Sequence, residues 1–310
     1  MFSLHQIFLM AKFYSQCPVC GNGNIEIVLT AKDHTVSGEL FDVWKCGNCA
    51  LRFTQSIPDE DEIGKYYQSE NYISHSDTAK GFINSLYHKV RNHTLQSKQN
   101  LIKSKTALQH GNILDVGAGT GAFLNTMKKG GWNVTGIEPD EIARKNAFAL
   151  YDLSLKPAQE FYNLPEAFFD AITMWHVLEH VYDLQGYILQ LKKLLKPGGV
   201  LFIAVPNYTC HDAKVYRQNW AAYDVPRHLY HFSPKAMKEL LTKHQLNISQ
   251  IKPMWFDSFY VSMLSEKYKT EKNNYFSAWI TGFISNCKAF FNKKRCSSLI
   301  YVIKKVGEAG

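Results

Sequence analysis

Apolar residues occur along the chain in short runs that alternate with amphipathic segments. Four of these runs have the length of buried strands, at residues 112–116, 132–137, 169–175 and 200–205. The segment Ala122–Lys129 and a longer one ending at Leu195 have the apolar spacing of amphipathic helices. A Lys-Pro-Gly-Gly turn at 196–199 ends the second helix and reverses the chain. The alternation of strands and helices predicts an α/β fold.

The pattern changes on both sides of this central region. Residues 25–44 contain alternating β-type residues, whereas residues 59 to about 105 have a helical pattern rich in Tyr, His, Asn and Ser. The acidic run at 59–62 stands where a helix would begin, a position that the helix dipole favours. Near the end of the chain, apolar residues recur at helical spacing up to Phe291, and a second apolar stretch follows at 299–306. We therefore predict four regions, at residues 1–56, 57–108, 109–250 and 251–310.

Composition and charge exclude several classes of protein. The 310 residues, 45% of them hydrophobic, suffice for one large core or two smaller ones and argue against disorder or a disulfide scaffold. No stretch of 18 uncharged apolar residues occurs, so we expect no membrane-spanning helix. The net charge of +8 is concentrated in residues 251–310, which carry 10 basic and 4 acidic residues. A nearly neutral body with a basic tail fits this distribution better than a uniformly basic nucleic-acid binder.

The N-terminus has a short apolar run at residues 7–10 but neither a basic segment before it nor a small-residue cleavage site. We therefore expect no signal peptide, and Met10 is an alternative start. The odd count of seven cysteines in a chain without a secretion signal argues against a disulfide framework and favours the reducing cytoplasm.

Four of the cysteines form two C-x2-C pairs, Cys17 with Cys20 and Cys46 with Cys49, separated by 25 residues. Each pair places two thiolates on a tight turn, and four converging thiolates bind Zn²⁺ tetrahedrally with no open position for catalysis. A redox role is disfavoured because there are two such pairs and neither opens a helix in a βαβ unit. We predict a structural zinc ribbon that stabilises a module too small to bury its own core.

A glycine-rich loop, residues 117–121, follows the strand that ends at Val116 and precedes a helix. Glycines allow a ligand to approach the backbone, and a helix N-terminus offers free N–H groups. Glu138 ends the next strand, 19 residues after Gly119, at the distance of a carboxylate that binds ribose hydroxyls. Gly117-x-Gly119-x-x-Ala122 alone also fits a dinucleotide fingerprint, so the loop by itself does not distinguish NAD from another adenosine cofactor.

Four segments in order carry a resemblance to a known family: 113–123 (ILDVGAGTGAF), Glu138, 170–180 with its His-Val-Leu-Glu-His end, and 195–204 (LKPGGVLFIA). They resemble the successive motifs of class I S-adenosylmethionine (SAM)-dependent methyltransferases, in the small-molecule branch that includes ubiquinone biosynthesis. The resemblance covers about residues 105–250. It implies a Rossmann-like sheet with helices on both faces, here preceded by the zinc ribbon and a helical connector or cap. Similar zinc knuckles occur in some sugar C-methyltransferases and in one class of ribosomal-RNA methyltransferase.

The resemblance implies which residues hold SAM. Asp115 and the loop backbone would hold the methionine portion and Glu138 the ribose. Ala158 or Gln159, at the end of what is the third strand in this family, would hold the adenine, and Trp175 and His176 would lie beside the sulfonium. Asp115 could instead only brace the loop. The full set of predicted cofactor-binding residues is Asp115, Gly117, Ala118, Gly119, Gly121, Glu138, Pro139, Gln159 and Trp175.

Methyl transfer needs a base only if the acceptor must lose a proton. The candidates lie mainly in the segment after the strand at 200–205, where an insertion would hang over the ligand-binding edge of the sheet. The predicted catalytic residues are His228, His231, Tyr223 and His176. Alternatively, Ser233-Pro234 simply starts a helix, and His228 and His231 are structural. For His180 we expect a structural role, and at these histidines we expect no metal.

The sequence is compatible with three functions. The first is transfer of a methyl group to O or C of a small-molecule, sugar or lipid-like acceptor. The second is an RNA methyltransferase with the zinc module as an RNA clamp, disfavoured because residues 1–110 have a net charge near zero. The third is a non-catalytic SAM-binding protein. Residues 276–306 would either contact anionic lipid or pack on the core or a second subunit, so we predict a cytoplasmic protein with a possible peripheral membrane contact.

Overall fold

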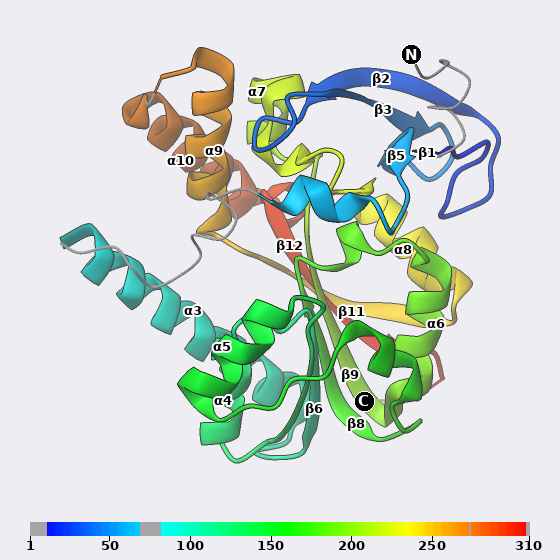
Figure 1. Cartoon of the computed structure of the whole chain (residues 1–310), viewed down its shortest axis with the longest axis vertical. Helices are drawn as coiled ribbons and strands as arrows, with labels where there is room; N and C mark the ends of the chain where they lie inside the picture. Colours follow the sequence, from blue (N-terminus) through cyan, green and yellow to red (C-terminus); the bar gives the residue numbers. More distant parts are fainter. Residues whose placement is uncertain (1–10, 69–81, 273, 308–310) are drawn as a thin grey trace.

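The computed structural model describes residues 11–68, 82–272 and 274–307. Its central element is a six-stranded sheet with the strand order β11-β12-β9-β8-β6-β7 (Figure 1). Strands β6 (Asn112–Val116), β7 (Asn133–Ile137), β8 (Phe169–Trp175) and β9 (Leu195–Pro206) are parallel. This confirms the predicted Rossmann-like α/β fold. The alternative start at Met10 lies outside the described residues.

Helices cover both faces of this sheet (Figure 1). On one face lie α3 (Phe82–Thr106), α4 (Ala122–Lys129) and α5 (Glu141–Tyr151), and on the other lie α6 (Leu184–Leu194) and α8 (Pro234–Lys243). The apolar strand residues point alternately into the two resulting cores, because successive side chains of a strand face opposite sides. The Ser233 side chain accepts a hydrogen bond from the Ala236 backbone N–H, so Ser233-Pro234 does start a helix.

The last sixty residues do not form a separate extension. Strand β11 (Leu246–Pro253) is an edge strand, and β12 (Ser298–Lys305) inserts between β11 and β9, antiparallel to both. The second apolar stretch is therefore a buried strand, and interpreting it as part of a lipid or subunit surface is wrong for Leu299–Ile303. Its apolar run without alternation is typical of a strand covered on both faces. Between β11 and β12, α9 (Asp257–Thr270) and α10 (Tyr275–Phe291) form a helical hairpin.

The predicted ribbon region forms a second, antiparallel sheet of β2 (Ile25–Lys32), β3 (Leu40–Cys46) and β4 (Arg52–Thr54). A fourth strand, β10 (Tyr230–His231), comes from the insertion of the large domain and pairs with β4. The Gln185 side chain of α6 also donates a hydrogen bond to the backbone carbonyl of Pro18. The ribbon is thus joined to the large domain rather than separated from it by a linker.

The region predicted as a helical connector is only partly helical. The short strand β5 (Ile57–Pro58) pairs with β1 (Ala11–Lys12), and the acidic run leads into a single 3-10 helix, η2 (Ile63–Tyr67). Residues 69–81 lie outside the described part of the chain. The remaining short 3-10 helices and the helix α7 occupy the connections: η3 (Ala158–Asn163), η4 (Leu178–His180), α7 (His211–Tyr216), η5 (Arg217–Asn219), η6 (Ala221–Tyr223) and η7 (Lys293–Arg295).

Candidate active site

The glycine loop joins β6 to α4 in a left-handed backbone conformation. Gly117, Gly119 and Gly121 have φ angles of +72°, +55° and +78°. A Cβ atom on Gly117 would lie 2.4 Å from Val177, so this position requires glycine for packing as well. At Gly119 a Cβ would meet nothing within 4 Å. The loop therefore faces open space at the predicted cofactor site.

Glu138 lies against the same loop. One carboxylate oxygen accepts a hydrogen bond of 2.7 Å from the Gly119 N–H, and the other accepts one of 3.0 Å from the Asp140 N–H. Burial raises the pKa of Glu138, and these two hydrogen bonds oppose that shift. Pro139, next in the chain, is exposed and accepts a hydrogen bond from Arg144 through its carbonyl. Glu138 is thus placed to fix the loop and to face whatever the loop binds.

Asp115 is buried at the end of β6 and accepts a hydrogen bond of 2.6 Å from the Thr173 hydroxyl. Burial raises the pKa of its carboxyl group to about 7, an effect that Thr173 and the nearby Lys98 reduce. Burial likewise lowers the pKa of Lys98 to about 8, and the charges of Asp115 and Asp257 oppose that shift. The Lys98 ammonium lies 4.1 Å from the centre of the Trp175 ring. Lys98 was not among the predicted site residues, because a lysine in a polar helix is usually solvated.

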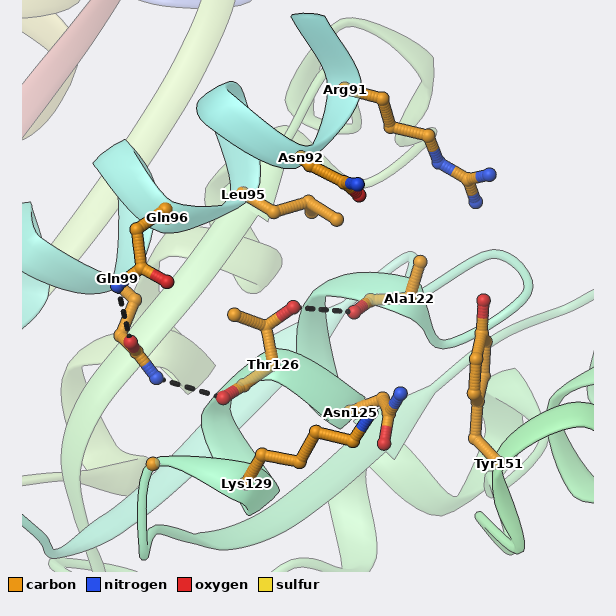
Figure 2. A pocket seen from close by; sticks show the side chains of 11 residues that line it. Arg91, Asn92, Leu95, Gln96, Gln99, Ala122, Asn125, Thr126, Lys129 and Tyr151 are labelled. Atoms are coloured by element: carbon orange, nitrogen blue, oxygen red, sulfur yellow. Dashed lines mark hydrogen bonds between the residues drawn. The ribbon is translucent and has the colours of Figure 1, made fainter. Parts of the chain in front are cut away.

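Helix α3 carries Lys98 to this position by packing along α4. The Gln99 side chain donates a hydrogen bond of 2.8 Å to the Thr126 carbonyl, and a groove of about 550 Å³ lies between the two helices. Figure 2 shows Arg91, Lys129 and Tyr151 around this groove. Of the predicted site residues, none lines it.

The segment predicted to hold the adenine, around Ala158 and Gln159, does not form a regular strand. Only Lys156 pairs with Ile137, as an isolated bridge, and Ala158 and Gln159 begin the 3-10 helix η3. Gln159 is exposed. The expected end of a third strand is therefore a single bridge followed by a helical turn.

His176 lies between two carboxylates at the end of β8. Its Nε2 is 3.1 Å from Asp257 of α9, and its Nδ1 is 3.4 Å from the buried Glu179. Burial alone would lower the pKa of His176, but Asp257 and Glu179 raise it to about 10. The ring is therefore held as an imidazolium at neutral pH. This geometry argues against the predicted role of His176 as a base, because a base must be unprotonated.

A cavity of about 850 Å³ opens beside His176 and Asp257. Most of its wall comes from the turn after β2, the insertion around residues 221–228 and α9, and the ends of β8 and β9 and the start of β12 complete it. Three histidines besides His176 line it, namely His34, His180 and His228. A cavity of this size suits a small-molecule ligand.

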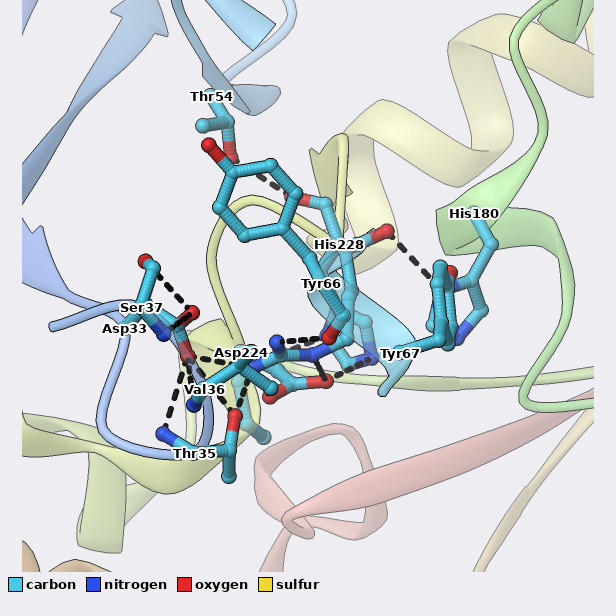
Figure 3. Close-up of polar contacts among 12 residues, drawn as sticks. Asp33, Thr35, Val36, Ser37, Thr54, Tyr66, Tyr67, His180, Asp224 and His228 are labelled. Atoms are coloured by element: carbon cyan, nitrogen blue, oxygen red, sulfur yellow. Dashed lines mark hydrogen bonds and ion pairs between the residues drawn. The ribbon is translucent and has the colours of Figure 1, made fainter. Parts of the chain in front are cut away.

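His180 and His228 meet in this cavity with ring centres 4.6 Å apart (Figure 3). The Nδ1 atoms of both rings lie 2.9 Å from backbone carbonyls, of Arg227 and Ala222 respectively. Carbonyl oxygens only accept, so each Nδ1 carries the proton and each Nε2 carries a lone pair. Burial and the neighbouring His228 lower the pKa of His180 to about 4.

His231 and Tyr223 are placed away from the cavity. The buried His231 hydrogen-bonds Thr54 through Nε2 at 3.1 Å, and burial lowers its pKa well below the usual range. The Tyr223 hydroxyl accepts a hydrogen bond from Arg52, and burial raises its pKa to about 12. Both residues join the insertion to the ribbon strand β4. The geometry thus does not support their predicted catalytic roles, and for His231 it matches the alternative of a structural histidine.

A buried ion pair connects the ribbon to the insertion. Arg227 lies 3.0 Å from Asp33, in the turn after β2, and 2.6 Å from Asp224, and the side chains of Arg227 and Asp33 are 1% and 0% exposed. Asp33 also accepts hydrogen bonds from Thr35 and Ser37, which hold the turn in shape (Figure 3). Arg227 precedes His228, so this pair fixes the backbone of a cavity residue.

Within the part of the chain that the structure describes, two groups of side chains have the geometry of metal ligands. The four predicted cysteines are one group, with Sγ distances of 3.5 Å for Cys17–Cys49 and 3.6 Å for Cys20–Cys46. The second group is Glu179, His180 and His228, whose ligand atoms lie within 4.8 Å of one another. We expected no metal at these histidines because no local spacing joins a histidine pair to a third carboxylate, whereas the fold brings His228 next to Glu179 and His180.

The sheet order, the glycine loop and the carboxylates at the ends of β6 and β7 together define the class I SAM-dependent methyltransferase fold. Residues 87–251, more than half of the chain, match the family described as "Methyltransferase domain", and the chain belongs to this family.

Among curated proteins, the chain is 41% identical over 108 residues to a ubiquinone biosynthesis O-methyltransferase of Actinobacillus pleuropneumoniae. The matched segment covers 31% of this chain and 46% of that protein. The chain is 31% identical over 119 residues to a demethylmenaquinone methyltransferase of Tropheryma whipplei, covering 37% and 50%. The chain thus spans about half the length of the curated relatives it matches. A SAM-dependent methyltransferase structure from Archaeoglobus fulgidus is similar at 17% identity, with a TM-score of 0.45, covering 71% of this chain and 100% of that one.

Proposed function

We propose that the protein transfers a methyl group from SAM to an oxygen or carbon atom of a small-molecule, sugar or lipid-like acceptor. The observation that carries this proposal is the cavity of about 850 Å³, which shares His176 and Asp257 with the cluster around Asp115 and Lys98. An acceptor in the cavity would lie next to the cofactor site. The ubiquinone and menaquinone methyltransferases among the relatives support the small-molecule class.

Several features of the cofactor site fit SAM. The loop offers left-handed glycines with open space over Gly119, and Asp115 and Glu138 offer carboxylates for the amino group and the ribose hydroxyls. Lys98 offers a positive charge for the carboxylate of the methionine portion. The Trp175 Nε1 is buried without a hydrogen-bond partner in the described part of the chain, as expected for a group that faces a ligand. Bound SAM would supply an electrophilic methyl group, already activated as a sulfonium.

His228 is the base in this proposal. Its Nδ1–H donates to the Ala222 carbonyl, so the lone pair on Nε2 can take a proton from an acceptor hydroxyl or C–H group. Asp224 lies 3.9 Å from that Nε2 and stabilises the imidazolium that forms. His180 is a weaker candidate because burial lowers its pKa to about 4. The other contribution of the chain is positioning, which can supply much of the catalysis of such a displacement.

We propose further that Cys17, Cys20, Cys46 and Cys49 bind one structural Zn²⁺. Tetrahedral ligation with Zn–S bonds of about 2.3 Å separates neighbouring sulfur atoms by roughly 3.8 Å. The two Sγ distances of 3.5 and 3.6 Å lie near that value, and all four cysteines are free thiols. The three-stranded sheet of the ribbon adds the expected surroundings.

The ribbon serves the acceptor site in this proposal, not RNA. Lys32, His34 and Thr35, in and beside the turn after β2, line the cavity, and Asp33 binds Arg227 behind them. The His34 ring stacks on Tyr268 of α9 with centres 4.3 Å apart, closing one wall. The ribbon residues nearest the large domain are thus engaged in the cavity wall, which leaves the RNA-clamp hypothesis without a supporting observation.

The test is incubation of the purified protein with a cell extract and methyl-labelled SAM. We expect label in a sugar, lipid or other small-molecule fraction, and its rate of incorporation should fall at least about a hundredfold with a His228→Asn variant that still binds SAM. Label confined to RNA would favour the alternative function. Calorimetry that detects no SAM binding would contradict the proposal altogether.

A further inference from the structure

Helix α10 buries its small and polar residues and exposes its large apolar ones, which is the reverse of an ordinary amphipathic helix. The residues it buries against the protein are small or polar, namely Ala278, Thr281, Gly282, Ser285 and Ala289. A Cβ atom on Gly282 would lie 2.9 Å from Phe259 of α9, so the two helices are in close contact at this point. The Ser285 hydroxyl donates a hydrogen bond of 2.6 Å to the buried Asp212. These contacts fix the orientation of the helix in the fold.

The large apolar residues of α10 consequently face outward. Phe276, Trp279, Phe283, Phe290 and Phe291 are 75%, 56%, 49%, 73% and 88% exposed. The Trp279 and Phe283 rings stack on each other with centres 5.3 Å apart. At 100° per residue these side chains and Cys287 occupy one half of the helix, and no charged residue of α10 falls within that half. Such a continuous exposed apolar face indicates an interaction site.

Basic residues adjoin this apolar face. The 3-10 helix η7 follows α10 directly and exposes Lys293, Lys294 and Arg295, and Lys288 lies exposed at the flank of α10. Acidic side chains are absent from α10 and η7, both of which are fully described. Aromatic residues next to an unneutralised cluster of lysine and arginine fit the interface of a bilayer with anionic headgroups. No helix in the described residues is long and apolar enough to cross a membrane.

We propose that the outward face of α10, together with Lys293, Lys294 and Arg295, docks on an anionic lipid surface. A second copy of the chain fits this face less well. In a two-fold dimer the same patch lies on both subunits, so its basic residues would meet no acidic partners.

The position of the hairpin connects this docking to the cavity. Helix α9 packs on α10 with one side and contributes Tyr260, Leu264 and Tyr268 to the cavity wall with another. A lipid surface under α10 would therefore lie close to the wall of the acceptor cavity. This placement suits a lipid-like acceptor, but the docking itself does not depend on the methyltransferase activity.

Vesicle sedimentation of the full chain tests the proposal. We expect binding to phosphatidylcholine vesicles that contain phosphatidylserine, and much weaker binding to pure phosphatidylcholine. Lys293→Gln with Lys294→Gln should weaken binding about thirtyfold, because each basic residue near an anionic surface contributes about 1 kcal/mol. Lys128 and Lys129, two consecutive lysines on α4, provide the matched control. Substituting both with glutamine should change vesicle binding less than about twofold.

The apolar contribution needs its own variants. Phe290→Ser with Phe291→Ser should lower binding more than about tenfold, whereas Phe148→Ser, at the 58% exposed Phe148 of α5, should leave it unchanged. Cys287 is the exposed one among the seven free cysteines, so a polarity-sensitive dye attached there reports contact directly. We expect its emission to shift to the blue on anionic vesicles.

Three results would overturn the proposal. One is the absence of sedimentation with anionic vesicles by a folded protein. Another is equal vesicle binding by the wild type, by Lys293→Gln with Lys294→Gln, and by Phe290→Ser with Phe291→Ser. The last is a concentration-dependent dimer in analytical ultracentrifugation that Phe290→Ser with Phe291→Ser abolishes, which would assign the face to a second copy.

Discussion

The ion pair between Asp33 and Arg227 gives the sharpest prediction, which concerns Asp33→Asn. Both side chains are almost completely buried, and Arg227 keeps Asp224 as a second partner. Breaking a buried ion pair on one side typically costs about 3–5 kcal/mol of unfolding free energy. Because Asp224 remains and the asparagine carbonyl can still accept a hydrogen bond in the turn, we expect the lower end, about 3 kcal/mol at neutral pH.

The pH dependence separates a charge effect from a packing effect. Burial raises the pKa of Asp33, but Arg227 and the turn N–H groups outweigh it and hold that pKa below its usual value. The ionised carboxylate therefore contributes stability above the unfolded pKa of about 3.9, and this contribution is lost as the pH falls through the lower folded pKa. The difference in unfolding free energy between wild type and Asp33→Asn should stay constant from pH 7 to about pH 5 and shrink below about pH 4.

Urea unfolding followed by tryptophan fluorescence at several pH values measures this difference. Asp42→Asn is the matched control, because Asp42 lies on β3 of the same ribbon in an exposed hydrogen bond with Thr30. We expect the control to change stability by less than about 0.5 kcal/mol. A loss below about 1 kcal/mol for Asp33→Asn at pH 7, or an equal loss at pH 7 and pH 3, would refute the reasoning. SAM affinity should be unchanged, since the pair lies on the acceptor side.

Three further predictions concern the sites themselves. His228→Asn should lower turnover about 10²–10⁴-fold with unchanged SAM affinity in calorimetry, and full activity would remove His228 as the base. Glu138→Ala should weaken SAM binding about 10–100-fold, as loss of a charged hydrogen-bonding group does, while Glu160→Ala on η3 should not; equal affinities would end the assignment. Metal analysis should find one zinc per chain, lost with Cys17→Ser, and a folded, metal-free wild type would contradict the ribbon proposal.

Short-range features of the site were predictable from the sequence. The glycine loop, with Asp115 before it and Glu138 after the next strand, depends on spacings within a single βαβ unit, and the structure places these residues together. The paired cysteines and the helix start at Ser233-Pro234 are local in the same sense. Each of these patterns encodes its own geometry, because a few consecutive residues determine a turn or a cap.

The residues around the cavity were not predictable in this way. Asp257 reaches His176 across 81 positions and Arg227 reaches Asp33 across 194, so no local pattern could reveal either contact. These contacts also changed the chemistry, since two carboxylates make His176 an imidazolium and leave His228 as the candidate base.

The sequence by itself determined the family, the α/β architecture and the candidate zinc and SAM ligands, because these depend on periodicity and on short spacings. Only the tertiary structure decided that His176 lies between two carboxylates, that Lys98 lies near Asp115 and Trp175, and that the last apolar stretch is an inner strand of the sheet. The physical reason is common to the three. Protonation, charge pairing and burial depend on neighbours distant in the sequence, and only folding brings those neighbours into contact.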